Sequence, residues 1–173
     1  MEFELKSNED KLIEDIIGFK GKILYGIPED TSQRGIDKNG KPVYNNAQIL
    51  AVMEAGSPTM EIPARELLGP VVKKHKDKIQ EIFGKVFDAL ISGDNKTAEH
   101  EMEVLAQRIE MWCKAYFRED NDWTPNSPIT IHGGWMKNKK SGKPFYVKGK
   151  GSDMPLIDTG ALRSAIRAIF VKS

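Results

Sequence analysis

At 173 residues, 39% of them hydrophobic, the chain is long enough to bury one modest core, and we expect a single domain over residues 1–173. Its 26 basic and 25 acidic residues leave a formal net charge of +1, which excludes an overall field that would attract nucleic acid or an anionic membrane. A single cysteine, Cys113, excludes an intramolecular disulfide and fits a reducing compartment, and we expect neither a signal peptide nor a membrane span.

The first third of the chain is predicted to form short elements. Residues 7–18 are typical of an opening helix with one apolar face, and residues 22–28 have the β-rich composition of a strand closed by a proline. Residues 29–35 are expected to be a loop, and the dipeptide Asn39-Gly40 favours a tight hairpin turn. Residues 46–55 suit a short helix that ends at Gly56, with a strand as the alternative.

The strongest periodic pattern predicts a helical hairpin. Apolar residues recur at steps of three and four from Ala64 to Ile91, which predicts one long helix kinked at Pro70. A second helix is predicted at about 98–117, with Thr97 as its N-cap. Because the turn between them is short, the helices are expected to run antiparallel. The residues predicted to face inward are Leu67, Leu68, Val71, Val72, His75, Ile79, Ile82, Phe83, Val86, Phe87 and Leu90, then Met102, Leu105, Ile109, Trp112, Cys113 and Tyr116.

Residues 133–152 are predicted to be an irregular, lysine-rich arm or insertion. The segment contains no acidic residue, and its aromatic residues are Trp135, Phe145 and Tyr146. Lysines interleaved with aromatic rings can bind nucleic acid, whereas an exposed loop kept soluble by lysines needs no partner; both interpretations stay open. Residues 38–44 and 140–146 share five identities in seven, which indicates either two similar hairpin turns or a duplicated functional loop.

Two further segments carry unusual residues. Arg65 lies where the first turn of the long helix is predicted, and the helix dipole does not favour a cation there, so a specific partner such as a carboxylate is expected. Asp158 and Thr159 are both good N-cap types before a helical turn that contains Leu162, with Arg163 pointing away from the core. For either segment, an ordinary capped helix start is the alternative. The chain is predicted to end in a strand at residues 168–171.

The sequence predicts neither a catalytic site nor a metal site. The histidines lack the spacing of metal ligands, and His75 is interpreted as a residue at the edge of the core. Cys113 lies on an apolar helix face, which predicts an inert buried thiol, and the glutamates of the second helix, Glu110 among them, are interpreted as a solvated face. We therefore expect a protein that is not an enzyme and that needs no cofactor.

Three segments resemble a known family. The first is E-x-G-[ST]-P…I-P-A-R at residues 54–65, followed by the long helix; the second is W-x-P-x-S-P-x-T-I at residues 123–131. The third is K-G-S-D-x-P-L-I-D-T-G-x-L-R-x-[SA]-I at residues 150–166. In composition and order these signature segments are similar to the neck or tail-completion proteins of long-tailed bacteriophages. Two departures are Ala-Arg-Glu-Leu-Leu at residues 64–68, where Ala-Arg-Pro-Phe is more usual, and residues 133–147, which look like an insertion.

The resemblance implies an α+β fold: a small antiparallel sheet packed with a long helical hairpin, plus an extended loop or arm. It implies a virion structural protein, assembled in the host cytoplasm, that forms a ring of six or twelve copies between head and tail. The implied partners are further copies of itself, portal or adaptor proteins, and tail terminator, tube or sheath proteins, with packaged DNA as a further candidate. The alternative is a nucleic-acid-binding module that uses the arm. The candidate contact residues are Arg65, Trp135, Phe145, Tyr146, Asp158, Thr159, Leu162 and Arg163.

Overall fold

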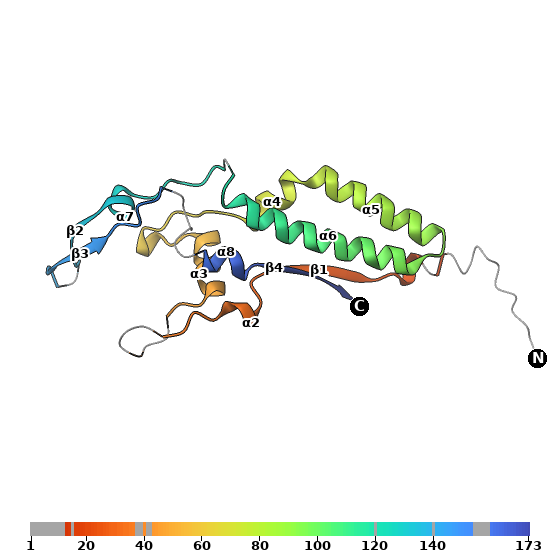
Figure 1. Ribbon diagram of the computed structural model, residues 1–173, viewed down its shortest axis with the longest axis horizontal. Coiled ribbons are helices and arrows are strands. Elements are labelled where there is room, and N and C mark those ends of the chain that lie inside the picture. Colours follow the sequence, from red (N-terminus) through yellow and green to blue (C-terminus); the bar gives the residue numbers. More distant parts are fainter. Residues whose placement is uncertain are drawn as a thin grey trace, which may run out of the picture. The chain divides into compact units, whose positions relative to one another are not determined.

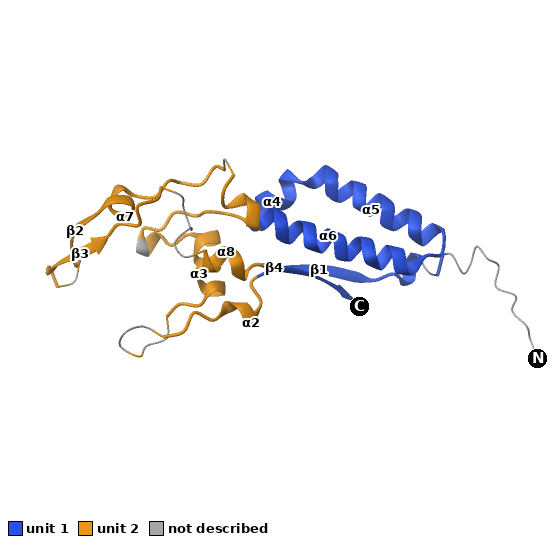
Figure 2. Ribbon diagram, viewed as in Figure 1, with its two compact units in different colours: residues 1–26, 68–113, 167–173 blue, residues 27–67, 114–166 orange. Residues whose placement is uncertain are grey.

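The computed structural model describes residues 13–14, 16–36, 40, 43–119, 121–139, 141–153 and 160–173 (Figure 1). The chain divides into two compact units: residues 1–26, 68–113 and 167–173 form unit 1, and residues 27–67 and 114–166 form unit 2 (Figure 2). The combination of helices with small antiparallel sheets confirms the expected α+β class. The single domain over residues 1–173 stays a prediction.

Unit 1 contains a two-stranded antiparallel sheet. Strand β1 (Gly21–Gly26) pairs with β4 (Arg167–Lys172) in a register that runs from Gly21 opposite Lys172 to Gly26 opposite Arg167. Both strands were predicted from their β-rich composition. Because side chains alternate along a strand, Leu24 and its cross-strand partner Ile169 share one face of the sheet, where they are 48% and 54% exposed.

The predicted helical hairpin is present in unit 1. Helix α5 (Lys76–Ile91) and helix α6 (Asn95–Tyr116) run antiparallel on either side of a tight turn in which Gly93 has a φ of 76° (Figure 1). The apolar positions that recur at steps of three and four form a buried core between the helices, as predicted. Its members include Ile82, Val86, Leu90, Leu105, Ile109 and Cys113.

The long first helix begins later than predicted and is interrupted. Helix α4 (Leu68–Lys74) starts at Leu68, not at Ala64, and α5 follows after a break at His75, where φ is −104° and ψ is 17°. Pro70 does not kink the helix, because it lies in the first turn, where a backbone N–H has no helical acceptor to lose. The His75 ring instead stacks on Trp112, with 4.1 Å between ring centroids.

Two further details of the helical hairpin differ from the prediction. The cap of α6 is Asp94, not Thr97: its carboxylate accepts the Thr97 backbone N–H at 3.0 Å and the Thr97 hydroxyl at 2.6 Å. These hydrogen bonds, the one from the hydroxyl first, lower the pKa of Asp94 below its ordinary value. Phe83 and Phe87 were predicted to face inward, but they are 48% and 53% exposed.

Unit 2 is built from short elements. Residues 29–35, predicted to be a loop, contain helix α2 (Glu29–Ser32), while the predicted helix appears as α3 (Asn46–Ala55), so the strand alternative is wrong. A capping box starts α3, because Asn45 and Gln48 each accept the other's backbone N–H. A 3₁₀ turn, η1 (Pro58–Met60), and helix α8 (Ala161–Ala165) complete this part.

The predicted irregular arm is instead a β-hairpin. Helix α7 (Pro128–His132) leads into strand β2 (Gly133–Lys137), which pairs antiparallel with β3 (Pro144–Lys148). At the tip, the Asn138 N–H donates to the Lys143 carbonyl at 2.9 Å, and Gly142 has a φ of 65°. Of the two similar segments, the described part of the second, residues 141–146, therefore belongs to a hairpin. The other turn, at Asn39, lies outside the described residues, as does most of the opening helix, of which 13–14 and 16–18 are helical.

Candidate functional site

The first signature segment folds into a closed turn after α3. Ser57 and Ile62 pair through two backbone hydrogen bonds of 2.8 and 3.0 Å, with η1 between them. Gly56, just before this pair, has a φ of 69°, and a Cβ atom added to it would lie 2.8 Å from the Ala64 nitrogen. Both observations require glycine at this position, since its backbone conformation and the space beside it exclude a side chain.

The acidic residue of the same segment has a structural role. The Glu54 carboxylate accepts the Leu67 backbone N–H at 2.8 Å, and the Met53 carbonyl accepts the Arg65 N–H at 2.7 Å. These bonds tie residues 65 and 67 to the end of α3, and residues 64–67 are not helical. They explain why α4 does not begin at Ala64.

Arg65 joins the first signature segment to the second. Its side chain is buried, with 7% of the residue exposed, and its Nε and Nη2 atoms donate to the carbonyl oxygens of Thr124 and Pro125 at 2.8 and 3.3 Å. The partner that the sequence predicted is therefore a pair of backbone carbonyls, not the carboxylate given as an example. Burial lowers the pKa of Arg65, but a guanidinium still keeps its proton at neutral pH.

Trp123 makes the reciprocal connection. Its indole Nε1 donates to the Glu66 carbonyl at 2.6 Å. The ring is 8% exposed and lies edge-on to Tyr116 and to Phe117, with 5.5 Å between centroids in each pair. We call the set Glu54, Gly56, Arg65 and Trp123 the clasp. Each member belongs to one of the first two signature segments.

The third signature segment is only partly described. Asp158 and Thr159 lie outside the described residues, and Gly160, with a φ of 75°, immediately precedes α8. Leu162 is buried at 5% exposure. Arg163 was predicted to point away from the core, but its Nε donates to the Lys114 carbonyl at 2.7 Å. That carbonyl lies in the last turn of α6, where a cation complements the helix dipole.

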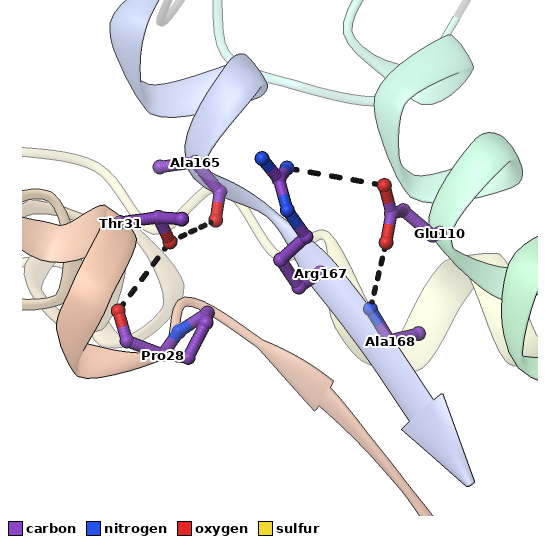
Figure 3. A network of polar contacts seen from close by, with 6 residues as sticks. All are labelled: Pro28, Thr31, Glu110, Ala165, Arg167 and Ala168. Atoms are coloured by element: carbon purple, nitrogen blue, oxygen red, sulfur yellow. Dashed lines mark hydrogen bonds and ion pairs between the residues drawn. The ribbon is translucent and has the colours of Figure 1, made fainter.

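Two polar residues anchor backbone groups near the last strand (Figure 3). In unit 2, the Thr31 hydroxyl donates to the Ala165 carbonyl at 2.7 Å. In unit 1, the Glu110 carboxylate accepts the Ala168 N–H at 3.0 Å and lies 3.9 Å from the Arg167 guanidinium. The interpretation of Glu110 as part of a solvated face is therefore wrong, because the Glu110 carboxylate binds a backbone N–H group of β4.

The three aromatic residues among the candidate contact residues lie on the hairpin β2–β3, and all three are exposed. Trp135 is 73% exposed and meets its cross-strand partner Tyr146, 59% exposed, edge to face with 5.6 Å between centroids. Met136 and Phe145 pair on the opposite face and are 40% and 44% exposed. Helix α7 approaches this second face, since a Cβ at Gly134 would lie 3.4 Å from Ile129 Cδ1. The hairpin thus carries three candidate contact residues, Trp135 and Tyr146 on one face and Phe145 on the other, and none of them belongs to the clasp.

Within the described ranges, no group of three or more His, Cys, Asp or Glu side chains is placed to hold a metal ion. No helix among the described residues is long and apolar enough to cross a membrane. The predicted burial of the Cys113 thiol is confirmed, at 0% exposure. Comparisons of this chain with protein-family models, with curated proteins and with solved structures found no match.

Proposed function

We propose that this chain is a virion structural protein of a tailed bacteriophage, a neck or tail-completion subunit that joins the head to the tail as part of a ring. The observation that carries the proposal is the clasp. Arg65 of the first signature segment bonds to the backbone of Thr124 and Pro125 in the second, and Trp123 of the second bonds to the backbone of Glu66, the residue that follows the first segment. Contacts between two signature segments that lie far apart in the sequence support the resemblance more strongly than two separate short matches do.

The surface of the hairpin supports an assembly role. The exposed pair Trp135 and Tyr146 on one face of a short two-stranded ribbon offers an aromatic contact surface of the kind that protein interfaces favour, and Phe145 is exposed on the other face. In a ring, each modest contact is repeated at every subunit boundary, so a small surface can hold the whole assembly. The proposed partners are further copies, portal or adaptor proteins, and tail terminator, tube or sheath proteins.

The test is the mass of the purified protein in solution, alone and after addition of portal-bearing heads or of tails. A ring, or a complex with heads or tails, is the expected result and would identify the neighbour. A chain that neither self-associates nor binds heads or tails would refute the proposal. Bovine serum albumin added in place of the chain controls for nonspecific trapping of protein by the particles.

A nucleic-acid-binding module is the second candidate, because the hairpin segment carries lysines and aromatic residues without an acidic residue. Phosphate contacts release counterions, so binding to DNA through these lysines would weaken steeply as the salt concentration rises. The measurement is the affinity for a short duplex and for a single strand at several salt concentrations, with Trp135→Ala to test stacking. Binding to DNA without any binding to heads, tails or other copies would favour this candidate.

A further inference from the structure

Unit 1 has an apolar groove beside the exposed face of α5. Phe83 and Phe87, one helical turn apart, line it together with Phe19, Val86, Leu90 and Met102. Gly84, between the two phenylalanines, also lines the groove, and a Cβ there would meet nothing within 4 Å. The two phenylalanines that face outward against the sequence prediction are therefore the wall of a cleft, not isolated surface residues.

Unit 2 carries an exposed aromatic surface on one face of the hairpin. Strand alternation and the β2–β3 register place Lys148, Tyr146, Trp135 and Lys137 on one face, opposite the face that α7 approaches. The aromatic pair is thus flanked by a lysine toward each end of the ribbon. The whole segment from residue 133 to residue 150 contains six lysines and no acidic residue, namely Lys137, Lys139, Lys140, Lys143, Lys148 and Lys150.

The segments that form the groove carry a small excess of carboxylates. Residues 81–103, which supply most of the groove and the turn beside it, and residues 19–22, which supply the rest, hold six carboxylates and four lysines, a formal net charge of −2. The carboxylates are Glu81, Asp88, Asp94, Glu99, Glu101 and Glu103, and the lysines are Lys20, Lys22, Lys85 and Lys96. Two of the carboxylates are already paired, Glu81 with Lys85 and Glu99 with Lys172. The aromatic ribbon and the apolar groove therefore match in polarity, and their formal charges are opposite in sign.

We propose that the occupant of the groove is a second copy of this chain, which inserts the Trp135–Tyr146 face of its hairpin between Phe19 and the two phenylalanines of α5. The donor and the acceptor surfaces are different, so the contact is heterologous. In such a pair one copy keeps an unused groove and the other keeps an unused hairpin, so further copies can add at both ends, and repetition produces a ring or an open filament. This inference rests on the proposed ring-forming function, for which it names the two surfaces of the subunit contact.

The experiment uses two full-length variants, each with one surface removed. The hairpin variant carries Trp135→Thr and Tyr146→Thr, and the groove variant carries Phe83→Gln and Phe87→Gln. All four residues are 48% or more exposed, so the substitutions leave the buried core intact. Threonine suits a strand and glutamine suits a helix, and circular dichroism checks that each variant stays folded.

The masses of the two variants are measured by analytical ultracentrifugation, separately and mixed. Each variant alone is expected to associate at least about tenfold more weakly than wild type, a loss of about 1.4 kcal/mol. The mixture is expected to form a one-to-one dimer and nothing larger. In that dimer the intact hairpin of the groove variant occupies the intact groove of the hairpin variant, and no competent surface remains.

The matched control carries Leu24→Ser and Ile169→Ser, two similarly exposed apolar residues on the β1–β4 sheet, and should assemble like wild type. Variants that fail alone and are not rescued by mixing would overturn the hairpin-in-groove contact, as would a hairpin variant that assembles normally. Wild type that binds heads or tails without self-association would also overturn it, while leaving the proposed function standing. Loss of DNA binding in the hairpin variant, with self-association unchanged, would assign the hairpin to nucleic acid instead.

Discussion

Substitution of Gly56 by alanine tests the clasp most directly. The backbone of Gly56, with φ of 69° and ψ of 177°, lies in a region that is essentially restricted to glycine, and another residue held there costs about 1–3 kcal/mol. The added methyl group would also lie 2.8 Å from the Ala64 nitrogen and 3.0 Å from the Ile62 oxygen. Both are backbone atoms that are themselves held in place, so they cannot rotate aside.

Overpacking of this kind costs about 1–3 kcal/mol, which brings the expected loss for Gly56→Ala to about 2–6 kcal/mol of unfolding free energy. That is a large fraction of the 5–15 kcal/mol that is typical of a folded domain. The assay is urea unfolding followed by tryptophan fluorescence and by circular dichroism. We expect a lower transition midpoint with the slope unchanged.

Gly84→Ala is the matched control because the substitution is the same and the expected sign is opposite. Gly84 lies within α5, and a Cβ there would meet nothing within 4 Å, so alanine should stabilise the protein by about 0.5–1 kcal/mol through helix propensity. A Gly56→Ala protein within about 0.5 kcal/mol of wild type would refute the argument, since surface substitutions alone vary by that much.

Three further predictions concern polar contacts. Arg65→Ala should lower the free energy of unfolding, measured in urea, by about 2–4 kcal/mol, because two backbone carbonyls lose a charged donor. An Arg65→Lys protein as stable as wild type would contradict the need for the two-pronged guanidinium. Trp123→Phe should cost about 1 kcal/mol by removing the donor to Glu66, and an unchanged midpoint would show that this bond adds nothing. The folded-state pKa of Asp94 is lowered, so its cap stabilises α6 at pH values above the ordinary carboxyl pKa, and this stabilisation is lost as the pH falls through the folded-state pKa. Stability should therefore fall less steeply at acidic pH in Asp94→Asn than in wild type. An equal fall in both proteins would show that the cap does not cause it.

Local patterns predicted the elements whose residues contact mainly one another. The steps of three and four gave the buried faces of α5 and α6, and β-rich composition gave β1 and β4. The start of α4 was missed because bonds to residues more than ten positions away decide it: the Met53 carbonyl and the Glu54 carboxylate bind the backbone N–H groups of Arg65 and Leu67. No window of sequence around Ala64 contains that information.

The hairpin and the outer face of α5 were missed for different reasons. Glycine and lysine are both depleted in strands, so residues 133–152 resemble a loop in composition, while the pairing of Trp135 with Tyr146 is visible only across the turn. Phe83 and Phe87 fit the apolar period of α5. Periodicity alone cannot separate a buried stripe from an apolar stripe that borders a cleft.

The buried cysteine gives this protein an internal reporter. Cys113 is the sole thiol of the chain, is fully covered, and belongs to the core of the helical hairpin. A thiol reagent can react with it only when that part of unit 1 opens, so the labelling rate under native conditions measures the free energy of local opening without an engineered probe. The same rate, followed during assembly, would show whether binding to a neighbour makes α5 and α6 open less often.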